Sequence, residues 1–179
     1  MIQRIQSILL ILIGLLMIGL IFTPIWQNKN KQQTIDGKTN DAKVTLTTLT
    51  LTLTGTEKTE QRDELNIIKE QKILNETKIT VYIAILAIAI AGVAGYSVFQ
   101  YRNRQLQMKL GAFNSLALCL IVVCIYINIV QGNKMLSDHA EGDFEIGFFL
   151  PIIAIVLNLV ANRLIRRDEN LVKSADRIR

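Results

Sequence analysis

Apolar residues are gathered into four long blocks that are separated by polar segments. A helix needs about 20 mostly apolar residues to cross the hydrocarbon of a bilayer. The first three uncharged blocks reach this length. The fourth becomes long enough if the aliphatic stem of Arg163 extends toward the interface, so that Leu164 and Ile165 join the span. The pattern therefore predicts an all-α membrane protein, a bundle of four transmembrane helices at residues 5–26, 79–100, 111–131 and 146–165.

We interpret the first block as an uncleaved span rather than a secretory signal. Its apolar run exceeds the roughly 7–15 residues typical of a signal sequence, and no Ala-x-Ala-like cleavage site follows it. Pro24 marks the exit from the helix, and Trp26 is suited to the membrane interface.

The segment between the first two helices, residues 27–78, contains a strand pattern. Leucine and threonine alternate from Val44 to Thr54, which is the period of a strand with one apolar face. The doubled Thr47-Thr48 breaks this phase and indicates a bulge or a change of face. The nearest partner strand is Lys31–Ile35, reversed through residues 36–41, so we expect a small β-hairpin here.

The pattern changes again after Gly55. Leu65, Ile68 and either Ile73 or Leu74 recur at helical spacing among Glu, Lys and Gln residues. This arrangement predicts an amphipathic helix over about residues 57–75 that leads into the second span.

The distribution of Lys and Arg sets the expected orientation. The loop at 101–110 and the tail at 166–179, together with Arg4 and Arg163, hold ten Lys or Arg and three acids. The loop at 132–145 holds one Lys and four acids, and the nine Lys or Arg of the first loop are accompanied by eight acids. The positive-inside rule acts most strongly in short loops near span ends, so both termini are expected in the cytoplasm and the other two loops outside. The net charge of +5 then belongs to the cytoplasmic rim and favours anionic lipid head groups, not nucleic acid, as the partner.

Small and polar residues inside the blocks predict how the helices pack. Ala87, Ala91 and Gly95 repeat at four-residue spacing, which suits close helix contact either within the bundle or with another chain. The blocks hold no Asp, Glu, Lys, Arg or His, and this argues against a proton relay or an ion-coupled pump. The polar residues expected to turn inward and bond across helices are Asn114, Ser115, Asn128, Asn158 and Asn162.

Candidate chemistry is confined to the acidic segment Ser137–Glu145, where His139 stands among four carboxylates. Oxygen ligands of this kind can hold Ca²⁺, but their spacing does not match an EF-hand. An acidic segment of this kind is more often a solvent-exposed loop without a metal. The sequence has no nucleophile elbow, phosphate-binding Gly-rich loop or redox Cys-x-x-Cys. We therefore expect no enzyme activity, no catalytic or metal site and no cofactor.

The C-terminal tail continues a helical pattern beyond the last span. Its first part carries cations that lipid head groups would hold at the cytoplasmic surface. Its later part has an apolar face, which a simple anchor does not explain, so the tail either lies on lipid or docks a protein. The residues concerned are Arg163, Arg166 and Arg167 in the first part and Leu171, Ala175 and Ile178 on the face.

Four segments carry a resemblance to a known family. They are Met1–Ser7 (MIQRIQS), Pro24-x-Trp26, Tyr101–Gln107 (YRNRxLQ) and Ala161–Arg179. The chain is similar over nearly its whole length to the domain-of-unknown-function 4293 family of Bacteroidota membrane proteins, and residues 27–78 match least well. The resemblance implies a four-span inner-membrane protein whose two outer loops, including the hairpin, lie in the periplasm. It implies no activity.

Two functional hypotheses of different classes follow. The first is a non-enzymatic accessory or scaffold subunit that packs against a larger membrane complex through the second span, the periplasmic hairpin or the tail. The alternative is a small oligomeric transporter or channel in which the inward Asn residues line a path. A lipid-acting enzyme built on the acidic loop ranks below both. The expected partners are anionic lipid and either a membrane protein or a second copy of the chain.

Overall fold

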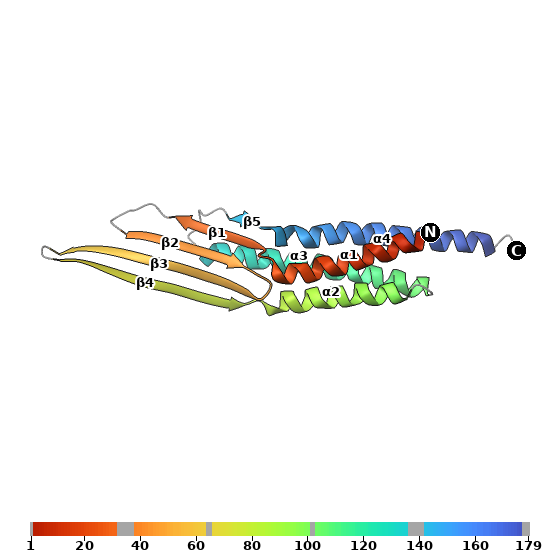
Figure 1. Ribbon diagram of the computed structural model, residues 1–179, viewed down its shortest axis with the longest axis horizontal. Helices are drawn as coiled ribbons and strands as arrows, with labels where there is room; N and C mark the ends of the chain where they lie inside the picture. Colours follow the sequence, from red (N-terminus) through yellow and green to blue (C-terminus); the bar gives the residue numbers. More distant parts are fainter. Residues whose placement is uncertain (1, 32–37, 64–65, 101–102, 136–141, 177–179) are drawn as a thin grey trace.

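The computed structural model describes residues 2–31, 38–63, 66–100, 103–135 and 142–176. In this part of the chain a helix bundle and an antiparallel sheet lie end to end, so the molecule is elongated (Figure 1). We call the two ends of the bundle the sheet end and the far end. The helices are α1 (Ile2–Phe22), α2 (Val81–Phe99), α3 (Arg104–Met135) and α4 (Ile146–Asp176). The strands are β1 (Trp26–Lys31), β2 (Lys38–Leu46), β3 (Thr50–Asp63), β4 (Asn66–Ile79) and β5 (Asp143–Phe144).

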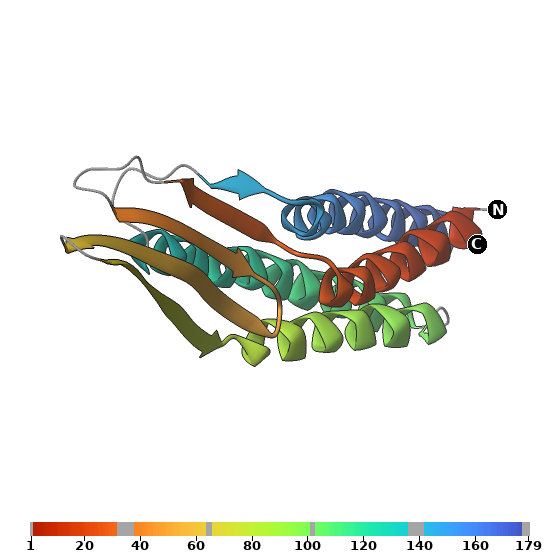
Figure 2. The same ribbon diagram turned by 60° about the vertical axis from the view of Figure 1, so that its left-hand side comes forward.

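Each of these helices contains a segment long and apolar enough to cross a membrane, so the prediction of four such helices is confirmed. α1 lies against α2 and α4, and α3 lies against the same two helices. α3 is longer than the bundle, and its last turns continue behind the sheet (Figure 2). α4 runs as one helix through the predicted tail and passes the start of α1 at the far end (Figure 1).

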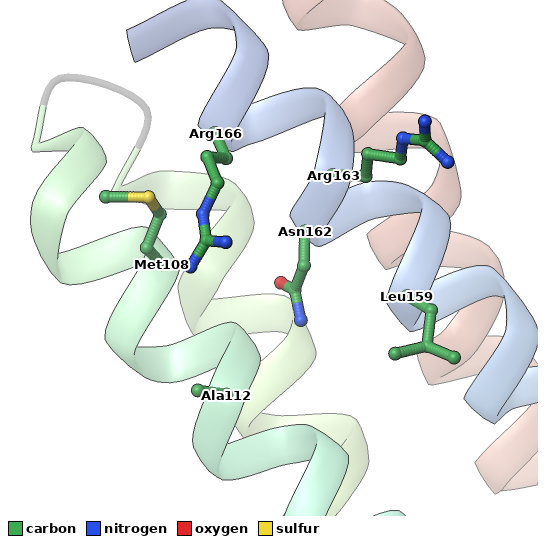
Figure 3. Close-up of a pocket in the computed structure, with 6 residues that line it drawn as sticks. All are labelled: Met108, Ala112, Leu159, Asn162, Arg163 and Arg166. Carbon is green, nitrogen blue, oxygen red and sulfur yellow. The ribbon is translucent and has the colours of Figure 1, made fainter. Parts of the chain in front are cut away.

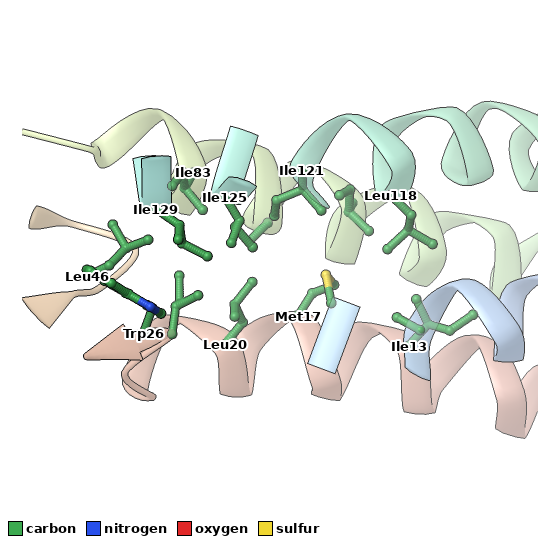
Figure 4. Packing of buried hydrophobic residues seen from close by; sticks show 14 of the residues in the cluster. Ile13, Met17, Leu20, Trp26, Leu46, Ile83, Leu118, Ile121, Ile125 and Ile129 are labelled. Carbon is green, nitrogen blue, oxygen red and sulfur yellow. The ribbon is translucent and has the colours of Figure 1, made fainter. Parts of the chain in front are cut away.

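The bundle interior near the sheet end is apolar. Ile13, Met17 and Leu20 of α1 face Ile121 and Ile125 of α3, and all five side chains are at most 1 % exposed (Figure 4). Their spacing of three or four residues keeps them on one face of each helix. These side chains fill the centre of the bundle in the half nearest the sheet.

The outer faces of the helices are apolar as well. Leu15, Ile85, Leu116 and Val156, one from each helix, are all more than half exposed, at 59, 62, 69 and 56 %. An exposed apolar surface of this extent is unusual for a protein in water and matches a lipid environment.

The five described strands form one antiparallel sheet in the order β4-β3-β2-β1-β5. Neighbours in the sheet are neighbours in the sequence except for β5, which joins from the other end of the chain through Trp26↔Phe144 and Gln27↔Asp143. β4 is therefore an edge strand of 14 residues.

The expected hairpin is part of this larger sheet, and the predicted strand Val44–Thr54 needs correction. It is two strands, because β2 ends at Leu46 and β3 begins at Thr50. The doubled threonine belongs to a turn and not to a bulge. The Thr47 N–H and hydroxyl both donate to the Thr50 carbonyl, at 2.9 and 3.0 Å. Threonine can close a turn through its hydroxyl, and a turn interrupts the alternation as a bulge does. In the predicted partner strand, Lys31 ends β1 and residues 32–35 lie outside the described residues.

The amphipathic helix predicted over residues 57–75 (Glu57–Asn75) is wrong. Residues 57–63 continue β3 and residues 66–75 belong to β4. The two strands pair without a break from Thr50↔Ile79 to Asp63↔Asn66. Glu, Lys and Gln favour helices, but the backbone hydrogen bonds of a long antiparallel ribbon override that propensity here. A hairpin, not a helix, leads into α2.

Candidate functional site

Backbone hydrogen bonds fix the sheet on the end of the bundle. Just after α1, the Ile25 N–H donates to the Leu46 carbonyl at 2.9 Å. Just before α2, the Thr80 N–H donates to the Leu49 carbonyl at 2.9 Å, and the Thr80 hydroxyl donates to the Thr47 carbonyl at 3.1 Å. Two crossings between bundle and sheet are thus tied to the same β2–β3 turn. The sheet therefore keeps a defined position relative to the helices.

Trp26 and two close-packed glycines complete this junction. Trp26 is 1 % exposed, so its ring is buried within the protein and not on its outer surface. It packs on α3 at Gly132, where an added Cβ would lie 2.9 Å from Trp26 Cζ3. At the start of α4 the Gly147 N–H donates to the Pro24 carbonyl at 3.1 Å, and a side chain on Gly147 would collide with that carbonyl. Only glycine allows backbone and ring to approach this closely.

β4 presents an unpaired backbone edge within the described part of the chain. It pairs with β3 alone along all 14 residues, a length of about 45 Å. Ladder hydrogen bonds alternate along an antiparallel pair. Since the Thr80 N–H, one position beyond β4, donates to Leu49, even-numbered residues of β4 bond to β3. The odd-numbered residues, among them Asn75 and Thr77, direct their N–H and C=O groups away from the sheet.

The far half of the bundle interior contains several buried polar side chains among its apolar ones. Asn158 of α4 is fully buried, and its Nδ2 donates to the Gly111 carbonyl at 3.1 Å and to Ser115 Oγ at 2.7 Å, both on α3. Gln107 of α3 donates through Nε2 to the Ser97 carbonyl of α2 at 3.3 Å. Interhelical hydrogen bonds of this kind hold helices together where lipid removes the hydrophobic drive to associate.

Asn114 differs from these neighbours. It is 2 % exposed, and among the described residues neither atom of its amide has a hydrogen-bond partner. The Oδ1 atom of Asn158 also lacks one in this part of the chain. Leaving such a group unpaired in the interior costs about 1–3 kcal/mol. These amides could hold an ordered water or another small polar group.

The small residues predicted to pack helices have unequal surroundings. Ala87 is fully buried. Ala91 is half-buried, and its carbonyl oxygen lies 3.8 Å from the place where Gly14 of α1 would carry a Cβ. Gly95 has no atom within 4 Å of the corresponding position, whereas Ala94 is 1 % exposed. The α1–α2 contact therefore includes Ala91, and contact of Gly95 with another chain stays a prediction.

The tail leaves the bundle as a direct continuation of α4. Asp168 Oδ2 accepts from Gln6 Nε2 of α1 at 3.2 Å, and the Asp168 carbonyl accepts from Arg104 Nη1 of α3 at 3.0 Å. Sequence reasoning missed this contact, because no local pattern links positions so far apart. Beyond it, Leu171 is 54 % and Val172 44 % exposed. Of the other predicted tail residues, Arg163, Arg166 and Arg167 are exposed, Ala175 lies within α4, and Ile178 lies outside the described residues.

The acidic segment is only partly described. Asp143 forms β5, while Asp138, His139 and Glu141 lie outside the described residues. Among the residues that are described, no group of three or more His, Cys, Asp or Glu side chains could hold a metal ion.

Comparison with known proteins yields a family but no activity. Residues 2–178 match the family described as domain of unknown function (DUF4293). No curated protein matches the chain.

Proposed function

The chain belongs to the DUF4293 family, and we propose that it is a non-enzymatic accessory or scaffold subunit of a larger complex in the inner membrane of a Bacteroidota bacterium. The observation that carries this proposal is the open edge of β4, which the junction hydrogen bonds hold in a defined position relative to the helices. A rigid platform of this kind presents a strand edge to a partner at a set height above the bilayer.

An unpaired edge of this length is a template for another strand. Proteins usually keep edge strands short or cover them, because exposed N–H and C=O groups recruit other chains. A partner segment added beside β4 would gain backbone hydrogen bonds at the odd-numbered positions. Lys69, Lys72 and Lys78 in the β4 sequence disfavour indiscriminate pairing. The partner we propose is therefore an extended segment of another membrane protein of the complex.

The distribution of cations supports a periplasmic position for the sheet. The four helices bring the start of α1 and the end of α4 to the far end of the bundle (Figure 1). Positively charged residues near span ends favour the cytoplasm, and anionic lipid head groups attract them there. We therefore propose that the far end is cytoplasmic. The described cations near this end include Arg104, Lys109, Arg163, Arg166 and Arg167.

The experiment that tests this function compares two substitutions at one edge position. Thr77 is exposed and directs its N–H outward, so Thr77→Pro removes a donor at the open edge and leaves the bonds to β3 in place. Thr77→Val keeps that N–H and serves as the matched control. After gentle solubilisation of native membranes, we expect the partner to copurify with the wild type and with Thr77→Val, and to be lost with Thr77→Pro.

Thermal unfolding of both variants separates loss of docking from loss of fold. Since the outward N–H has no partner among the described residues, we expect Thr77→Pro to change the unfolding free energy by less than about 1 kcal/mol. Equal copurification with the two variants would remove the β4 edge from the proposal. Repeated recovery of the wild-type chain alone, in several mild detergents, would overturn the subunit role itself.

The buried amides favour one second candidate, a small oligomeric transporter or channel. Asn114 and Asn158 have unused hydrogen-bonding groups that a polar solute could engage. Met17, Leu20 and Ile121, each 0 % exposed, argue against a path through a single chain. A path would have to run between copies. Solute flux into proteoliposomes that is lost in Asn114→Leu would favour this candidate over the subunit role.

A further inference from the structure

A pocket opens between α3 and α4 near the far end, apart from the sheet and its edge. It has a volume of about 300 Å³ and is lined by Met108, Ala112, Leu159, Asn162, Arg163 and Arg166. Figure 3 shows the side chains of Arg166 and Asn162 extending into the space between the two helices, with Leu159 further along α4. The Arg163 guanidinium points out of this space (Figure 3). The pocket thus has one cationic end and one apolar end.

The depth of these residues matches the layers of a lipid molecule. α4 begins at Ile146, and a helix rises about 1.5 Å per residue, so Arg166 lies about 30 Å further along, which equals the thickness of the hydrocarbon core. Arg166 is therefore at the edge of the hydrocarbon core, and its long side chain can extend outward to the lipid phosphates. Asn162 lies one turn deeper, on the acyl-chain side of the esters, and Leu159 lies within the acyl chains.

Two donor groups of the pocket, the Arg166 guanidinium and Asn162 Nδ2, are available to a ligand. Within the described part of the chain no hydrogen bond or ion pair engages the Arg166 guanidinium, and no acidic side chain lines the pocket. The buried Oδ1 of Asn162 has no partner there, and Nδ2 has only a 3.5 Å contact with Ser115 Oγ. A guanidinium forms its strongest hydrogen bonds in pairs with a carboxylate or a phosphate.

We propose that this pocket binds one anionic phospholipid. The phosphate accepts hydrogen bonds from Arg166, an ester carbonyl accepts one from Asn162 Nδ2, and an acyl chain lies along Leu159 and Ala112. A lipid fits better than free phosphate because the pocket continues from the guanidinium into an apolar wall at hydrocarbon depth. This inference stands on the pocket alone and does not rest on the proposed subunit role.

The test measures lipid binding to the full chain in detergent by native mass spectrometry, with phosphatidylglycerol as the probe. Arg166→Gln removes the pocket cation, and Arg167→Gln removes an exposed cation one residue along that does not line the pocket. We expect Arg166→Gln to weaken binding about tenfold, since a charge-assisted hydrogen bond is lost, and Arg167→Gln to weaken it less than about twofold. Millimolar inorganic phosphate is expected not to displace the lipid.

Three results would overturn the proposal. Equal weakening by the two substitutions would mean attraction to surface charge only. Unchanged binding by Arg166→Gln would exclude the pocket. Displacement of the lipid by inorganic phosphate would mean a site for soluble anions.

If Arg166→Gln fails to fold, Leu159→Trp replaces it as the test variant. Leu159 is 58 % exposed, so the larger ring fills the pocket without disturbing the core. Unchanged lipid binding in that variant would also overturn the proposal.

Discussion

Gly147 and Gly92 both lie in helices, but their surroundings are opposite. A Cβ on Gly147 would meet the Pro24 carbonyl, whereas nothing lies within 4 Å of a Cβ on Gly92. We predict that Gly147→Ala lowers the free energy of unfolding by about 1–3 kcal/mol, because a backbone neighbour cannot yield as a side chain can. Gly92→Ala should leave it unchanged or raise it by up to about 1 kcal/mol through helix propensity.

Denaturant titration of both alanine variants in the same detergent measures this difference. Similar unfolding free energies for the two variants would contradict the close contact between α4 and the α1 exit.

The buried Asn residues of the helices show which contacts of a single residue can be predicted from the sequence. Asn158 was expected to turn inward and bond across helices, and it does so with Gly111 and Ser115 of α3. The partners themselves could not be predicted, because they depend on the rotation of α3 and α4 about their axes. The same expectation for Asn114 fails in part. It is buried, but its amide has no partner among the described residues.

At the scale of elements, hydrophobic blocks predicted the helices well and the sheet poorly. A transmembrane helix satisfies its own backbone within one segment, so length and hydropathy are enough to identify it. A strand needs a partner that local sequence does not name. The segment 57–75 has the composition of a helix, and only its pairing with β3 and the link of β3 to β2 make it a strand. The last turn of α3, with Gly132 and Asn133, was likewise expected to be loop, and it supports the sheet instead.

The tail of α4 has a bound part that includes Asp168 and the buried Glu169, and it is exposed at Leu171 and Val172. A chain that ends after Asn170 keeps the hydrogen bonds of Asp168 with Gln6 and Arg104. We predict that it inserts normally and keeps its unfolding free energy within about 0.5 kcal/mol, since Leu171, Val172 and Ser174 are exposed and such side chains carry little stability. If the exposed part docks a protein, this truncation lowers the recovery of the partner.

A chain that ends after Arg167 is the comparison. It loses the Asp168 contacts as well, and we expect its unfolding free energy to fall by about 1.5–3 kcal/mol, the range for hydrogen bonds to charged groups. Thermal unfolding and copurification of both truncations provide the measurement. Undiminished partner recovery after removal of residues 171–179 would assign the tail to lipid contact alone.

The whole molecule is polarised along its length. One end is a sheet with an open edge (Figure 1), the middle is an apolar layer (Figure 4), and the far end combines buried polar side chains with exposed arginines. An open strand edge at one end and a cationic rim at the other suit a protein whose two ends face different compartments. The orientation proposed here, with the sheet in the periplasm, rests on the cations and can be measured directly.

Single cysteines report that orientation. Cys119 and Cys124 are both free thiols within α3, so they are first replaced by alanine. Thr77 in β4 and Ser174 near the end of α4 are exposed, and each is changed to cysteine in turn. In spheroplasts, we predict that a membrane-impermeant maleimide labels the Thr77→Cys variant at once and the Ser174→Cys variant only after the membrane is permeabilised. The reverse pattern would invert the proposed orientation. Immediate labelling of both would contradict the three crossings by α2, α3 and α4, because an odd number of crossings leaves the two positions on opposite sides of the membrane.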